Sequence, residues 1–159
     1  MSVKLHIHVR PLEIGDFSFI RDLASKQRNF TVPSTYVLWL MMRIKGAACL
    51  VAEDAHRGQL AYLIAVPVEG PEKSLFVWQL AASARGGGGR ATLALLTALR
   101  DFATRKHVRA IAFSMRPRSA AYRLIARYAD KLVASTPRLT SVLPFSIASD
   151  ESEYRIDLE

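Results

Sequence analysis

Residues 80–90 read Leu-Ala-Ala-Ser-Ala-Arg-Gly-Gly-Gly-Gly-Arg and join a predicted strand to a predicted helix. Consecutive glycines let backbone N–H groups approach a ligand closely, because no side chain stands in the way. At a helix N-terminus these N–H groups are unpaired, and the helix dipole favours an anion. Arg85 and Arg90 add fixed positive charge at both ends of the run. The stretch therefore predicts a cradle for a diphosphate; the alternative is a glycine linker without a ligand.

Three known phosphate-binding turns can be compared with this run. A P-loop requires Gly-Lys-Ser/Thr, which is absent. A Rossmann G-x-G-x-x-A pattern can be drawn through residues 86–91, but that fold also needs an acidic residue roughly 20 positions later. Residues 109–119 contain no acid. The acyl-CoA turn Arg/Gln-x-x-Gly-x-Gly/Ala matches at Arg85 and Gly88 and departs at its sixth position, which is Arg90.

The hydrophobic pattern on both sides of the run predicts one mixed α/β domain over residues 1–159. After the glycines, Leu95, Leu99 and Phe102 recur with the spacing of one helix face. Strands are predicted at 5–10, 47–52, 59–68, 74–82, 109–115, 138–143 and 153–158, and further helices at 16–27, at 34–45 with Ser34 as its cap, and from Ser119 onward. This order implies a mixed, mostly antiparallel sheet flanked by about four helices.

Composition and charge narrow the class of protein. The 159 residues are 50% hydrophobic, enough for a core, and no stretch approaches the roughly 20 apolar residues of a membrane span. We expect a soluble, cytoplasmic protein without a signal peptide. Cys49 is the single cysteine, so no internal disulfide or cysteine-based metal cluster can form. The net charge of +8 would attract a polyanionic cofactor, a nucleic acid or an anionic membrane.

The order of elements and the glycine turn together resemble the GNAT superfamily of N-acetyltransferases over nearly the whole chain. Within it, four segments resemble diaminobutyrate acetyltransferases of ectoine synthesis: Leu75–Gln79, Ser34–Tyr36, Pro117–Arg123 and Glu151–Ile156. One departure concerns the substrate. That family places an Asp two residues before the position of Pro33, and this chain has Thr31 there.

The GNAT resemblance implies acetyl-CoA as cosubstrate, no metal, and direct attack of a small-molecule primary amine on the thioester. The acceptor would be a diaminobutyrate-like amino acid, and a homodimer is the expected assembly. By this resemblance the cofactor-binding residues are Gln79, Leu80, Ala81, Ala82, Arg85, Gly86, Gly87, Gly88, Gly89 and Arg90. The predicted catalytic residues are Glu151 and Tyr36, and the predicted substrate-binding residues are Thr31, Ser34 and Trp78.

Two other functions remain open. Many GNAT enzymes carry a general-acid Tyr on the last long helix, and counting from Ser119 places Ala126 at that position. Together with Arg90 in the turn, this suits a GNAT fold that binds CoA without catalysis and serves as a regulatory module. The +8 charge also suits a basic nucleic-acid-binding domain, although the sequence shows no recognition motif for one.

Overall fold

The computed structural model describes residues 5–28, 30–116, 119–129, 138–142 and 152–158. The strands are β1 (Ile7–Pro11), β2 (Ala48–Asp54), β3 (Gly58–Val68), β4 (Ser74–Ala82), β5 (Ala110–Met115), β6 (Arg138–Val142) and β7 (Ser152–Asp157). The helices are the 3₁₀ turn η1 (Ile14–Asp16), α1 (Phe17–Ser25), α2 (Thr35–Arg43), α3 (Gly88–Arg105) and α4 (Ala120–Ala129). The seven strands form one sheet with the order β1-β2-β3-β4-β5-β7-β6.

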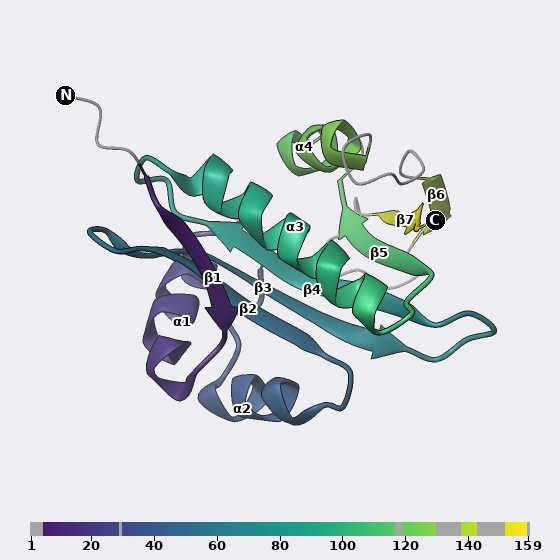
Figure 1. The fold of residues 1–159 in the computed structure, drawn as a ribbon, viewed down its shortest axis with the longest axis horizontal. Coiled ribbons are helices and arrows are strands. Elements are labelled where there is room, and N and C mark those ends of the chain that lie inside the picture. Colours follow the sequence, from purple (N-terminus) through teal and green to yellow (C-terminus); the bar gives the residue numbers. More distant parts are fainter. Residues whose placement is uncertain (1–4, 29, 117–118, 130–137, 143–151, 159) are drawn as a thin grey trace.

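The sheet is mixed and mostly antiparallel, which confirms the predicted fold class. Its one parallel pair is β4 with β5, and α3 is the connection between these two strands. The five other neighbouring pairs are antiparallel. Figure 1 shows α3 lying across one face of the sheet, with α1 and α2 on the opposite face and α4 beside α3. The crossover through α3 brings the glycine run to the end of β4, in the middle of the sheet.

The predicted element boundaries are close to the observed ones. β4 covers the predicted residues 74–82, and Ser34 caps α2 by accepting a hydrogen bond from the Val37 amide at 3.2 Å. β2 continues to Asp54, past its predicted end at Ala52, because its last residues still pair with β3. α1 begins at Phe17 because the preceding three residues form the 3₁₀ turn.

Two apolar clusters hold the layers together, one on each face of the sheet. The cluster under α3 includes Leu63, Leu75, Leu95, Leu99 and Ile111, all at most 2% exposed. The cluster under α1 and α2 includes Ile20, Leu38, Val51, Tyr62 and Ile64, all fully buried. Because both faces of the central strands are covered, β3 reads as a nearly continuous buried run. In the described part of the chain, no helix has the length and apolar character to cross a bilayer.

A buried ion-pair network fixes the start of α1 against the sheet. Asp16 is 2% exposed and accepts hydrogen bonds from the two terminal guanidinium nitrogens of Arg10, at 2.7 and 2.8 Å. It also accepts from Gln59 Nε2 at 3.0 Å and from the Glu13 amide at 2.8 Å. Burial raises the pKa of this carboxyl, but the hydrogen bonds from Arg10, Gln59 and Glu13 outweigh it and lower the pKa to about 2.

The lowered pKa of Asp16 predicts a specific loss of stability in acid. Its stabilising effect is complete above the ordinary pKa of 3.8 and is lost as the pH falls through about 2. The difference corresponds to about 2 kcal/mol in the free energy of unfolding. Asp16→Asn should remove this share of the acid sensitivity and destabilise the protein at pH 7 by about 3 kcal/mol, because Arg10 loses a buried partner.

Denaturant unfolding at pH 7 and in acid measures both effects. Asp22→Asn is the matched control, because Asp22 is an exposed carboxylate on α1, the helix that directly follows Asp16. If the Asp16→Asn and Asp22→Asn variants have the same stability and the same acid sensitivity, the network does not stabilise the fold.

Candidate functional site

The edge of β4 opens at Trp78. β4 pairs with β5 only from Ser74 with Ala110 to Val77 with Phe113, whereas β4 itself continues to Ala82. In the described residues no strand pairs with this edge of β4 beyond Val77. Backbone N–H and C=O groups need partners when they are shielded from water, so this edge offers hydrogen bonds to a ligand.

A β-bulge at Trp78 coincides with this opening. Opposite β3, the register moves from Ala65 with Val77 to Ile64 with Gln79, so Trp78 is the extra residue. An extra residue reverses which side chains face each side of the sheet. Before the bulge, Val77 packs in the cluster under α3, and beyond it Ala81 packs in the cluster under α1 and α2. The partly buried Trp78 contacts that second cluster. Its contact with the acceptor stays a prediction.

Gln79, next to the bulge, holds a loop against the open strand. Its side chain is 4% exposed. Its Oε1 accepts a hydrogen bond from the Tyr62 hydroxyl at 2.9 Å, and its Nε2 donates to the Thr31 carbonyl at 2.9 Å. Thr31 is itself exposed. The amide of Gln79 therefore ties the segment between α1 and α2 to β3 and β4, a role the sequence did not indicate.

The glycine run forms a tight turn from β4 into α3. Gly87 is the N-cap of α3, and its φ of 109° is a left-handed conformation that favours glycine. A Cβ on Gly88 would lie 2.3 Å from the Ser83 carbonyl oxygen, so a side chain there would displace the backbone. Gly89 has open space, with nothing within 4 Å of a Cβ. The turn therefore needs glycine at 87 and 88, whereas Gly89 leaves room for a ligand.

Positive charge surrounds this turn. The N–H groups of the first turn of α3 have no intrahelical acceptor, and Gly87 has no side chain to cap them. Arg85 is exposed beside them. Arg57, from the turn between β2 and β3, donates from a guanidinium nitrogen to the Gly86 carbonyl at 2.6 Å. These groups together suit a diphosphate.

Arg90, the residue that departs from the acyl-CoA pattern, does not block the turn. It is the third residue of α3 and is exposed. It lines a shallow groove along the outer face of this helix with Leu93, Thr97 and Asp101. Its bulk is therefore accommodated on the surface of α3.

The other predicted site residues are placed as follows. Ser34 uses its hydroxyl to cap α2. Tyr36 is 65% exposed and stacks on Trp39, with ring centroids 6.1 Å apart, while the Arg43 guanidinium lies 4.2 Å from the centre of the Trp39 ring. The geometry gives Tyr36 an exposed position beside the segment that Gln79 holds. Its catalytic role stays a prediction.

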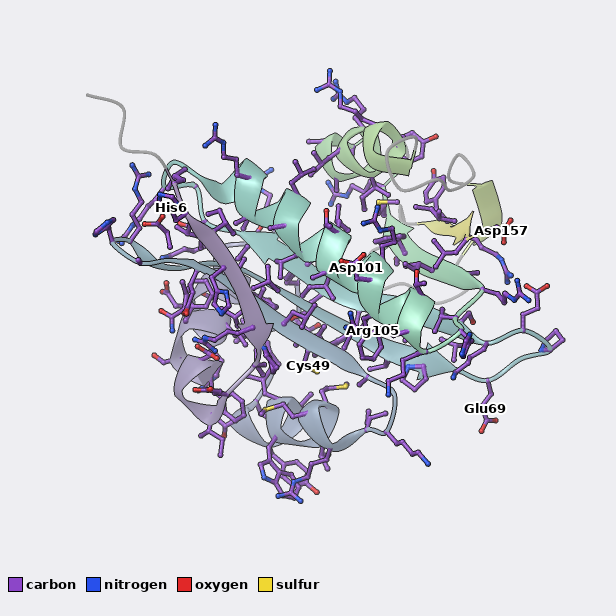
Figure 2. All side chains as sticks on the ribbon, in the orientation of Figure 1. His6, Cys49, Glu69, Asp101, Arg105 and Asp157 are labelled. Atoms are coloured by element: carbon purple, nitrogen blue, oxygen red, sulfur yellow. The ribbon has the colours of Figure 1, made fainter. Side chains whose placement is uncertain are left out.

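The positions predicted for an acid or a base are Glu151 and the residue at 126 on α4. Glu151 lies outside the described residues, so its role also stays a prediction. On α4, Ala126 is partly buried, and the neighbouring Tyr122 packs against Tyr154 with ring centroids 4.9 Å apart. Cys49 lies between the sheet and α2 (Figure 2), and burial raises the pKa of its thiol to about 11. A thiolate nucleophile at Cys49 is therefore scarce at neutral pH.

Two side-chain contacts of the candidate site escaped the sequence prediction: that of Arg57 with Gly86, and those of the Gln79 amide with Tyr62 and Thr31. Each acts on a partner far along the chain, 29 residues away for Arg57 and 48 for Gln79. A glutamine among apolar residues of a buried strand is the one sequence signal that marks a functional or structural role for Gln79. For Arg57, in a polar hairpin turn, no such signal exists.

Comparison with known proteins identifies the fold. Neither a protein-family model nor a curated protein sequence matches the chain. Solved structures do. The diaminobutyrate acetyltransferase of Paenibacillus lautus, in complex with L-2,4-diaminobutyric acid and coenzyme A, has a TM-score of 0.77 at 22% identity, covering 97% of this chain and 96% of that chain.

Two further acetyltransferases share the architecture. The ribosomal-protein-S18-alanine N-acetyltransferase of Escherichia coli has a TM-score of 0.69 at 16% identity and covers 96% of this chain and 93% of its own. A variant spermidine N-acetyltransferase of Vibrio cholerae has a TM-score of 0.69 at 14% identity, with 96% and 92% covered. The chain therefore has the GNAT acetyltransferase fold, as the resemblance predicted.

Proposed function

We propose that this chain transfers the acetyl group of acetyl-CoA to the primary amine of a small molecule. The opening of β4 at the Trp78 bulge, next to the glycine turn, is the observation that carries this proposal. It provides an extended row of backbone groups for the pantetheine arm and N–H donors at its far end for the diphosphate. The acetyltransferases that share the fold support CoA as the guest.

The open edge of β4 also suits the chemistry of acyl transfer. Attack of an amine on a thioester carbonyl places negative charge on the carbonyl oxygen, and preorganised N–H groups stabilise that charge. We assign this role to the backbone of residues 78–82, with the pantetheine arm held by Gln79 through Ala82. Arg85, Arg90 and the glycines of the turn are proposed to hold the diphosphate.

The acceptor is proposed to approach from the face of the sheet covered by α1 and α2. Trp78 turns to this face at the bulge, and Gln79 holds Thr31 there. Trp78, Thr31 and Ser34 would line the acceptor pocket, with Tyr36 and Glu151 handling the protons. Because neutral amines attack and ammonium ions do not, one of these groups must accept a proton from the acceptor.

An amino acid related to diaminobutyrate is the acceptor that the fold comparison favours, since that compound is bound in the Paenibacillus lautus enzyme. Thr31 weighs against diaminobutyrate itself, because the resemblance places an Asp at that position to meet the second amine. A CoA-binding module without catalysis is the second candidate. The observation that favours it is Ala126, which offers no proton at the α4 position where a general acid is expected.

An amine panel separates the two candidates. The protein is mixed with acetyl-CoA and, in turn, with L-2,4-diaminobutyrate, spermidine and an alanine-initiated peptide, and free thiol is followed. Release of thiol with a primary amine, together with an acetylated product by mass spectrometry, is the expected outcome. CoA binding without turnover on any amine would favour the module, and absence of CoA binding would reject both candidates.

Gly89→Asp should separate CoA affinity from fold stability. The position has room for the side chain, and a carboxylate in the first turn of a helix is stabilising by about 0.5 kcal/mol. The same carboxylate would repel the diphosphate, so we expect CoA affinity to fall at least tenfold while the melting temperature stays level or rises. Gly89→Asn is the uncharged control of similar shape. Equal CoA affinity in the two variants would remove the turn from the cofactor site.

Gln79→Met should weaken binding of the acceptor amine more than binding of CoA. The substitution removes the bond to Thr31 and leaves the Tyr62 hydroxyl without its acceptor, at a cost of about 1–3 kcal/mol in stability. We expect the KM for the amine to rise at least fivefold while the Kd for CoA changes less than twofold. Tyr62→Phe, which keeps the bond to Thr31, serves as the control and should leave the amine KM nearly unchanged. An unchanged KM in Gln79→Met would show that the tie does not order the acceptor site.

A further inference from the structure

A cavity lies beside the glycine turn, on the face of the sheet that α1 covers. Its volume is about 760 Å³, within the range of small-molecule sites. Its walls come from α1, from the beginning of β3 with the preceding turn, and from residues 82–85 at the end of β4. We call it the α1 pocket. Phe19, Leu23 and Leu60 provide its apolar surface.

The polar wall of the α1 pocket is mostly positive. Lys26, Arg57 and Arg85 line it, and Asp22 is its one acidic lining residue. Lys26 pairs with Asp22 at 2.7 Å, but both side chains are more than 60% exposed. Such an exposed pair is weak, so the Lys26 ammonium can turn to a ligand at little cost. Three cationic residues from three separate segments therefore line one cavity, and a single carboxylate is among its described lining residues.

The α1 pocket does not extend to the bulge where acetyl transfer is proposed, although Ala82 and Arg85 belong both to its lining and to the proposed CoA site. Neither Trp78 nor Gln79 lines it. Ala82, the nearest lining residue of β4, is four positions beyond Trp78, which is about 13 Å along an extended strand. A small ligand in the pocket would therefore not reach a thioester held at the bulge.

Arg57 and Arg85 connect the α1 pocket to the glycine turn. Arg57 lines the pocket and also donates to the Gly86 carbonyl at 2.6 Å. Arg85 lines the pocket and begins the run of glycines. A ligand that recruits either guanidinium changes the charge or the position of groups next to the α3 N-terminus.

We propose that the α1 pocket binds a small organic anion carrying carboxylate or phosphate groups, with Lys26, Arg57 and Arg85 as its ligands. The apolar surface of Phe19 and Leu60 accommodates the carbon skeleton of this anion. Occupancy opposes CoA binding, because two anions next to Arg85 repel each other and share its charge. This coupling rests on the proposed function, since it requires CoA at the turn, whereas anion binding to the pocket does not. Coupling of this kind is reciprocal.

Citrate and inorganic phosphate are the probes, the first for carboxylates and the second for phosphate groups. Their binding to the full chain is measured by calorimetry at constant ionic strength, without CoA. Lys26→Gln tests the pocket, and Lys45→Gln is the control that removes the same charge from an exposed loop. We expect at least one probe to bind, and Lys26→Gln to weaken it at least fivefold while Lys45→Gln changes it less than twofold. Equal affinities in the two variants, or no binding of either probe, would overturn the proposal.

A titration of CoA at increasing concentrations of the bound probe distinguishes the pocket from the turn itself. Binding at separate, coupled sites raises the apparent Kd of CoA to a plateau, whereas competition for the glycine turn raises it without limit. We expect the apparent Kd of CoA to reach a plateau. In Lys26→Gln this plateau should be reached only at a higher probe concentration. An increase without a plateau would place the anion on the turn and overturn the proposal. Loss of acetyl transfer on every amine, with probe binding intact, would instead reject the proposed function alone.

Discussion

Among the strands that the structure describes, β4 has a partner on one side only beyond Val77, and much of the candidate site depends on this. The bulge at Trp78 and the end of pairing with β5 occur at the same point of the strand. The bulge reverses the faces of β4, which brings Gln79 to Tyr62 and to the Thr31 carbonyl. On the side of β4 that faces β5, no strand of the described residues pairs with residues 78–82, so a linear ligand can use their backbone groups. The inserted residue thus lies where the open edge begins, and Gln79 next to it fixes the loop between α1 and α2.

The glycine turn follows from the same arrangement. Since β4 returns through α3 to the parallel strand β5, the helix must begin directly after the strand and fold back onto the sheet. Gly88 has no room for a side chain against the Ser83 carbonyl, and Gly87 takes a left-handed φ. The turn places the N-terminus of α3 shortly after the open stretch of β4 in the chain. The structural demand for small residues and the chemical demand for exposed N–H groups are therefore met by the same glycines.

The sequence predicted the elements far better than the site. Local patterns sufficed for β4 and for the Ser34 cap, because strand periodicity and capping act over a few residues. The bulge at Trp78 could not be predicted, since it depends on the register between two strands and leaves no gap in the hydrophobic pattern. The contact of Arg57 with Gly86 was missed for the same reason, because it joins two turns that only the folded sheet brings together. Arg90 departs from the acyl-CoA pattern in the sequence, and only the helix geometry shows it on the outer face of α3.

The net charge of +8 is unevenly compensated over the described residues. Asp16 and Glu53 are both bound by Arg10, and Asp54 accepts from the backbone amides of His6, His56 and Arg57. These acids of the N-terminal half are thus occupied by the structure. Around the glycine turn, in contrast, no carboxylate of the described residues pairs with Arg85 or Arg90. Positive potential is left uncompensated where a polyanionic cofactor would enter, and such a field increases the rate of encounter with it. Among the described residues, the glycine turn is therefore a place where a phosphate-bearing ligand would meet arginines that no carboxylate neutralises.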